Sequence, residues 1–357
     1  MTVIASYNPA GCAIVIADTL INGPVGEAGP PQTVLPTLGN VSNFFSGSWA
    51  INKSSQKVCI ITDYCALAWA DSQLQARHFI TRLRRLSGRI RITRDVMKKL
   101  FDKLGTHELQ LAGAILEEDQ LHTFSIGCEQ FECPILGEVH CGGSGASVVH
   151  DFAPIMQSIA PAPPGEDEIS AYAASIALTQ VAHLLNAEFR KGDSADSLLE
   201  FFGGGYEMAV FYDGRFHKLS ANFVFLDISI NPMSRTLRVG NPKLIIAQTY
   251  CGDTLKYEAI VPKSAEEDEV TRHDHIEIPP FAHPSARKGD PSMQEDINWG
   301  CFVFVDNFKH GGAALASIIV RSQTPPIEYR VTDGQLTFEY SESAGRQISA
   351  YINAHYL

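Results

Sequence analysis

The chain has 357 residues, of which 45% are hydrophobic and 19% are charged, so it can build a packed core and is not expected to be disordered. Its formal net charge of −12 argues against nucleic acid as a partner, because phosphate binding needs a basic surface. The eight cysteines are scattered without a Cys-x-x-Cys pair, which predicts reduced, buried thiols. Neither a signal peptide nor an apolar segment of membrane-spanning length is visible, so we expect a cytoplasmic protein without a membrane partner.

The first part of the chain is predicted to be rich in strands. Strands are expected over residues 2–7, 12–18, 57–61 and 64–69. Pro9-Ala10-Gly11 separates the first two strands and indicates a hairpin. Residues 19–50 are rich in Gly, Pro, Asn and Ser, and they predict a long loop or insertion.

Blocks of helices and strands then alternate as far as residue 218. Helical spacing predicts helices over 72–87 and about 94–104, the second of them capped by Thr93. Further elements are expected as strands at 109–116, 121–127 and 134–140, helices near 147–158, 166–190 and 195–201, and strands at 206–212 and 215–218. This order favours two packed antiparallel sheets with helices on both outer faces over the parallel sheet of a βαβ protein.

Beyond residue 220 the chain is again rich in strand patterns. We therefore expect a first domain over 1–219 and a second domain, or a large elaboration of the first, over 220–357. Residues 264–296 are charged and rich in proline, which predicts a loop or linker. An amphipathic helix over about 343–354 is expected to end this part.

Thr2 follows Met1, and this position could supply a nucleophile. If Met1 is removed, Thr2 carries a free α-amine, which titrates near pH ~8, beside its own hydroxyl. A nucleophile and a base then share one residue. A residue as small as threonine is compatible with removal of the methionine, but if Met1 is retained the α-amine is consumed in a peptide bond and this chemistry fails.

Three further residues stand at positions where chemistry could converge on Thr2. Asp18 ends the second strand, so the predicted hairpin would return it to the chain start. Lys57 opens the third strand, and Ser144 lies in a glycine-rich turn before a helix. Taken singly, each is more often a turn, surface or capping residue.

Taken together, these motifs resemble those of proteasome β-subunits and HslV-type peptidases, which are amino-terminal nucleophile (Ntn) hydrolases. The resemblance is carried, in chain order, by Thr2-Val3-Ile4, Ala17-Asp18, Lys57-Val58 and Gly143-Ser144-Gly145. It covers about residues 2–218 and implies an α+β fold, a four-layered αββα sandwich, here followed by a strand-rich C-terminal extension. It also implies a ring of identical subunits.

The resemblance further implies hydrolysis of a peptide or other amide bond through an acyl-enzyme on Thr2. The α-amine of Thr2 would accept the proton of its hydroxyl, and the charge of Lys57 would lower the pKa of that hydroxyl. Asp18 would keep Lys57 charged and oriented, and Ser144 would help to shuttle the proton.

Several residues depart from the pattern of these enzymes. Where a Gly-Gly pair should supply the oxyanion donor, the chain has Trp69, Ala70 and Asp71. A main-chain N–H of Asp71 could still serve, but its carboxylate would oppose a developing negative charge, and Trp69 could fill the substrate pocket. Glu200 stands in place of an aspartate, and the serine expected after it is absent.

These departures leave two classes of function open. The first is a threonine hydrolase, in which the 19–50 insertion would be a lid or a plug over the substrate site. The second is a catalytically inactive scaffold or binding protein with the same fold.

A metal enzyme is a third hypothesis. His273-Asp274-His275, with His283, contains a His-x-His motif that can ligate zinc. Its charged, proline-rich surroundings favour a solvated loop, so no metal is predicted. No Gly-x-Gly-x-x-Gly motif follows a strand and opens a helix, so no dinucleotide cofactor is predicted either.

Overall fold

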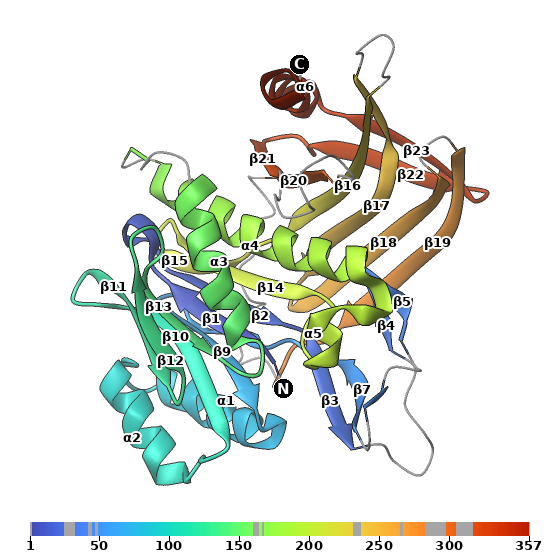
Figure 1. Cartoon of the computed structure of the whole chain (residues 1–357). Helices are drawn as coiled ribbons and strands as arrows, with labels where there is room; N and C mark the ends of the chain where they lie inside the picture. Colours follow the sequence, from blue (N-terminus) through green and yellow to red (C-terminus); the bar gives the residue numbers. More distant parts are fainter. Residues whose placement is uncertain are drawn as a thin grey trace.

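The computed structural model describes residues 2–24, 33–41, 45–46, 49–159, 164–165, 168–230, 237–264, 267–282, 298–304 and 317–356. Over these ranges the chain mixes helices with a large share of strands, so the predicted α+β class is confirmed (Figure 1). Within the same ranges, no helix combines the length and the apolar character needed to cross a lipid bilayer.

The first sheet contains the predicted hairpin at the start of the chain. Its strands, in spatial order, are β12 (Glu129–Cys133), β13 (Gly137–Gly142), β1 (Ile4–Tyr7), β2 (Ile14–Asp18), β14 (Tyr206–Tyr212) and β15 (Arg215–Lys218). β1 and β2 pair antiparallel, with Ile4 opposite Ala17, and a 3-10 turn at Pro9–Gly11 joins them. This pairing returns the end of β2 to the first residues of the chain.

The second sheet packs face to face with the first. Its strands, in spatial order, are β11 (Gln120–Ile126), β10 (Leu109–Glu117), β9 (Cys65–Asp71) and β8 (Val58–Thr62). β8 and β9 are buried on both faces. Val58 and Ala68 pack between the sheets, whereas Leu67 packs under helices on the outer face. Continuous apolar runs are expected for strands buried in this way.

Helices cover the outer face of each sheet. α1 (Gln73–Ser87) and α2 (Arg94–Leu104) pack on the second sheet, and α3 (Ala146–Ile159) and α4 (Ile169–Lys191) pack on the first. The Thr93 hydroxyl accepts a hydrogen bond from Val96 N at 3.2 Å, so the predicted helix cap is confirmed. A short helix, α5 (Asp196–Leu199), follows α4.

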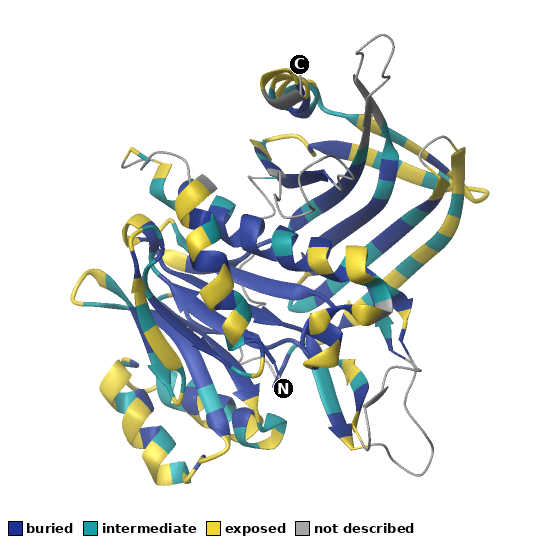
Figure 2. Ribbon diagram, in the orientation of Figure 1, coloured by how far each residue is buried: buried dark blue, intermediate teal, exposed yellow. Residues whose placement is uncertain are grey.

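The C-terminal part of the chain forms a long, curved sheet that lies beyond α4 (Figure 1). Its spatial order is β21 (Ser317–Ser322), β20 (Asn298–Phe304), β16 (Ala221–Ile230), β17 (Leu237–Cys251), β18 (Thr254–Ser264), β19 (Glu267–Ile278), β23 (Gln335–Tyr340) and β22 (Ile327–Thr332). Phe223 and Phe225 share a core with α4, and Val224 and Leu226 pack on the other face with α6 (Glu342–Tyr356). α4 therefore lies between two sheets, which explains its many buried residues (Figure 2).

The prediction of a loop over 19–50 was wrong for part of that segment. The described residues form β3 (Leu20–Pro24) and β7 (Trp49–Ser54), which pair antiparallel, together with the short strands β4 (Val34–Leu35), β5 (Gly39–Asn40) and β6 (Phe45–Ser46). The pairing of β3 with β7 joins residues far apart in sequence, so local composition did not predict it.

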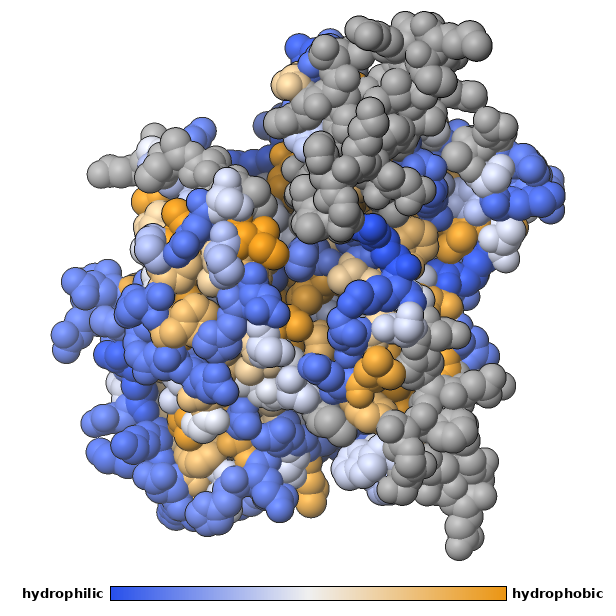
Figure 3. Space-filling model, in the orientation of Figure 1, coloured by the Kyte–Doolittle hydropathy of each residue, from blue (hydrophilic) through white to orange (hydrophobic). Residues whose placement is uncertain are grey.

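The predicted loop over 264–296 was wrong for residues 267–278, which form β19, whereas residues 283–296, with His283, lie outside the described residues. Most side chains of β19 are exposed or only partly buried, so the segment lacks the apolar alternation of a half-buried strand. Hydrophilic residues cover the outer ends of β19 and of the β22–β23 hairpin in Figure 3. β12 was missed for the same reason, since it is an edge strand with mostly exposed residues.

The cysteines are free, as predicted, and each lies in the described part of the chain. Most are buried. Cys251 is exposed, contrary to expectation, because it stands where β17 turns into β18.

Candidate active site

The four residues that the sequence singled out as a catalytic group come together. Thr2 lies just before β1, Asp18 ends β2, Lys57 precedes β8, and Ser144 lies in the turn between β13 and α3. The side chains of Thr2, Asp18 and Lys57 are buried, and Thr2 retains 2% exposure. Three separate strands of the two facing sheets therefore bring a hydroxyl, a carboxylate and an ammonium to one point.

The ammonium group of Lys57 connects the hydroxyl to the carboxylate. Its Nζ atom lies 2.5 Å from Thr2 Oγ1 and 2.8 Å from Asp18 Oδ1. Lys57 thus donates to both groups, and all three side chains are buried. A cation at this distance favours the deprotonated form of the threonine hydroxyl.

Main-chain N–H groups hold the Asp18 carboxylate in place. Val3 N donates to Oδ1 at 3.0 Å, while Leu20 N and Gly203 N each donate to Oδ2 at 3.1 Å. Hydrogen bonds of this kind stabilise a carboxylate in its charged form. Asp18 is therefore fixed as the ionised partner of Lys57.

Burial and ion pairing act in opposite directions on this pair. Burial lowers the pKa of Lys57 below its usual range, and the nearby charge of Asp18, with weaker contributions from Glu207 and Asp71, opposes that shift. Burial likewise raises the pKa of Asp18, against the charge of Lys57. With Asp18 held by its N–H donors, we treat the pair as ionised near neutral pH, with the Lys57 proton bound less tightly than in water.

Ser144 contacts the main chain of Thr2. Thr2 N donates to Ser144 Oγ at 3.2 Å, and the Ser144 hydroxyl donates to the main-chain carbonyl of Glu200 at 2.8 Å. Glu200 was predicted as a stand-in for a catalytic aspartate. Its contact with the site is made by this carbonyl, and its side chain is exposed. The orientation of the Ser144 hydroxyl leaves its oxygen free to accept from the Thr2 nitrogen.

The turn that carries Ser144 needs glycine at position 143. Gly143 has φ +81°, and a Cβ atom there would fall 2.0 Å from the carbonyl oxygen of Thr2. That same oxygen accepts a hydrogen bond from Gly145 N at 3.0 Å. The close approach of the two main chains sets the distance between Thr2 and Ser144.

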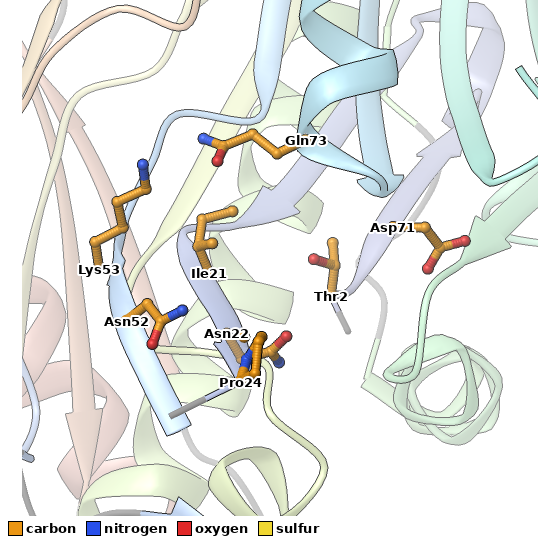
Figure 4. A pocket seen from close by; sticks show the side chains of 9 residues that line it. Thr2, Ile21, Asn22, Pro24, Asn52, Lys53, Asp71 and Gln73 are labelled. Carbon is orange, nitrogen blue, oxygen red and sulfur yellow. The ribbon is translucent and has the colours of Figure 1, made fainter. Parts of the chain in front are cut away.

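A pocket of about 460 Å³ opens beside Thr2 (Figure 4). Within the described residues its lining comprises Thr2, Ile21, Asn22, Gly23, Pro24, Asn52, Lys53, Asp71 and Gln73. Most of these residues belong to β3 and β7. The segment predicted as a lid or plug therefore contributes a wall of the pocket, and the lining mixes polar and apolar residues.

Of the residues predicted for the oxyanion donor and substrate pocket, Asp71 does line the pocket. It has a left-handed backbone with φ +71°, which is unusual for a residue other than glycine. Trp69 is fully buried and stacks on Phe281 at 4.4 Å, so it packs in the core rather than filling the described pocket. Ala70 packs between the two sheets.

A second buried ion pair lies behind the site and was not predicted. Lys218 Nζ is 2.6 Å from Glu207 Oε1, and both side chains are almost fully buried. Glu207 Oε2 accepts from the main-chain N–H groups of Lys57 and Val58, and Lys218 donates to the Val58 carbonyl. The pair therefore fixes the backbone that carries Lys57. A charged residue inside the apolar stretch 206–212 was the signal that could have revealed it.

The C-terminal sheet also contacts the segments around the site. Gln56, the residue before Lys57, donates from Nε2 to the carbonyls of Asp253 at 2.6 Å and Ile278 at 2.9 Å. The Tyr257 hydroxyl donates to the Tyr206 carbonyl at 3.0 Å. The strand-rich extension thus helps to position the main chain on which the site depends.

No protein-family model and no curated protein sequence matches this chain. The function is therefore argued from the geometry of the site.

Proposed function

We propose that this chain is a threonine-type Ntn hydrolase that cleaves a peptide or another amide bond. The contact of Thr2 Oγ1 with Lys57 Nζ, in a buried pair with Asp18 at the edge of a pocket, carries this proposal. The packing of helices on the outer faces of two stacked sheets supports an Ntn-hydrolase sandwich, followed by an extension from residue 220.

In the proposed reaction, removal of whatever precedes Thr2 first frees its α-amine. As Oγ1 attacks the substrate carbonyl carbon, the amine accepts the hydroxyl proton and passes it to the leaving nitrogen when the amide bond breaks. The acyl group remains on Thr2 as an ester. Water then attacks the ester, giving its proton to the amine, and the acid is released with recovery of the hydroxyl.

The remaining residues have supporting roles in this scheme. Lys57 stabilises negative charge on Oγ1, Asp18 keeps Lys57 oriented, and Ser144 positions the amine. The main-chain N–H of Asp71 would stabilise the oxyanion. In Figure 4 the Asp71 carboxylate points away from Thr2, which favours this use of its main chain.

Covalent labelling with a β-lactone, which acylates an activated hydroxyl, tests the proposal. In protein whose first residue is Thr2, we expect one adduct, located on Thr2 by peptide mass spectrometry. Thr2→Ala should abolish it and Thr2→Ser should retain part of it, because serine keeps both the hydroxyl and the amine. Labelling of Thr2→Ala at the wild-type rate, or no labelling of wild type, would support the inactive scaffold instead.

Asp71→Asn is expected to speed this labelling about three- to fivefold, because it removes a partly screened negative charge near the oxyanion. Asparagine tolerates the left-handed backbone, so the main-chain donor should stay in place. The labelling rate constants of the two proteins, compared at equal reagent concentration, provide the measurement. A slower rate for Asp71→Asn would show that the carboxylate itself assists the reaction.

A further inference from the structure

One face of the C-terminal sheet carries a cluster of three residues that can ligate a metal, Glu258, His273 and His275. None of them belongs to the proposed active site. Glu258 lies on β18 directly opposite His275 on β19, and His273 stands two residues along the same strand. Side chains alternate across a strand, so the two histidines project from the same face as Glu258. This cluster extends the His-x-His motif with a carboxylate from the neighbouring strand.

The side chains of the cluster already converge. His273 Nε2 lies 2.7 Å from Glu258 Oε1, and the ring centroids of the two histidines are 4.5 Å apart. One ligand atom from each of the three residues lies within 4.8 Å of the others. Ligands about 2.1 Å from a tetrahedral metal stand roughly 3.4 Å apart, so small rotations would complete the geometry.

The residues around the cluster hold the Glu258 carboxylate in place and leave the three ligands accessible to solvent. The Tyr329 hydroxyl donates to Glu258 Oε2 at 2.9 Å, which fixes the carboxylate with Oε1 toward the histidines. The side chains of His273 and Glu258 are about one-third exposed, at 28% and 32%. An ion can therefore enter from solvent, and water can complete its coordination.

We propose that Glu258, His273 and His275 bind a Zn²⁺ ion. Two imidazoles and one carboxylate form a donor set that suits zinc, whereas Mg²⁺ and Ca²⁺ prefer oxygen ligands throughout. Three protein ligands leave a fourth position for water. The ion would tie β18 to β19 and, through Tyr329, to β22.

A second group, Glu129, Cys141 and His150, also has ligand atoms close together. Cys141 is fully buried, so its sulfur is less accessible to an ion from solvent than the partly exposed ligands of the C-terminal sheet. Burial also raises the pKa of the Cys141 thiol to about 12, which opposes formation of the thiolate that zinc requires. We therefore assign the site to the C-terminal sheet and use this group as a control.

Zinc titration of the full-length, tag-free protein by calorimetry tests the proposal. Wild type should bind zinc at this site, and His273→Ala or His275→Ala should weaken that binding at least tenfold. Tyr329→Phe removes one hydroxyl behind Glu258 and should weaken it about tenfold, as expected for an outer-shell partner. The exposed control His107→Ala should bind like wild type.

Thermal unfolding provides an independent readout, since a ligand that binds the native state raises its melting temperature. Zinc should raise the melting temperature of wild type and His150→Ala, but not that of His273→Ala or His275→Ala. The melting temperatures without zinc show whether each variant is folded. Unchanged zinc affinity in His273→Ala and His275→Ala, or loss of binding in His150→Ala alone, would overturn the assignment.

Discussion

Lys57→Met is expected to slow covalent labelling of Thr2 about 10²–10⁴-fold, the range typical for removal of a group that assists proton transfer at a nucleophile. Methionine preserves the length of the side chain but removes the charge that lies 2.5 Å from Thr2 Oγ1. The measurement is the rate constant of adduct formation, followed by intact-protein mass spectrometry.

Two variants separate loss of chemistry from loss of structure. Lys98→Met removes an exposed lysine of α2 that lies outside the pocket lining, and it should label within about threefold of wild type, because it removes only a screened surface charge. Lys57→Met leaves Asp18 buried without its cation, so the double variant Lys57→Met/Asp18→Asn should recover part of the lost stability without recovering labelling, since the asparagine oxygen can still accept from Leu20 N and Gly203 N. Labelling of Lys57→Met at the wild-type rate would show that the ammonium group does not activate Thr2.

Glu207→Ala is expected to lower the free energy of unfolding by about 3–5 kcal/mol, because it leaves Lys218 charged and buried without its partner. It also removes the acceptor of the main-chain N–H groups of Lys57 and Val58. Urea unfolding followed by circular dichroism provides the measurement.

An exposed ion pair provides the matched control for the expected decrease in the free energy of unfolding. Lys263 and Glu269 are 2.7 Å apart, with both side chains about half exposed, so Glu269→Gln should leave the unfolding midpoint unchanged within error. Glu207→Ala/Lys218→Met should be more stable than Glu207→Ala alone, because it no longer buries an unpaired charge. Equal midpoints for Glu207→Ala and wild type would refute a structural role for the buried pair.

Much of the first part of the chain could be predicted because its signals are local. The β1–β2 hairpin joins residues close in sequence, and it alone returns Asp18 to the amino-terminal end of β1. Helix caps such as Thr93 act within one turn, so composition and spacing suffice to place them. The proximity of Lys57 to Thr2 needed the face-to-face packing of two sheets, and it was expected from the order of the motifs.

The features that the sequence predicted wrongly, or did not predict, depend on contacts between segments that are distant in the chain. Trp69 was expected in the pocket, but its ring stacks on Phe281, a residue of the C-terminal part of the chain, and packs in the core. β19 has no apolar face that would identify it as a strand, and its pairing with β18 maintains it. Burial of Glu207 or Lys218 alone in an apolar strand would be unfavourable, and their pairing becomes evident only when the fold brings the two charges together.

The identity of the first residue in protein purified from its native cell tests the central claim most directly. Peptide mass spectrometry of the amino terminus, with chemical tagging of free amines, makes this measurement. We predict that the mature chain begins at Thr2 with an unblocked amine that takes up the tag. A chain that retains Met1 or any other residue before Thr2, or that carries a blocked amine there, would contradict the proposed mechanism.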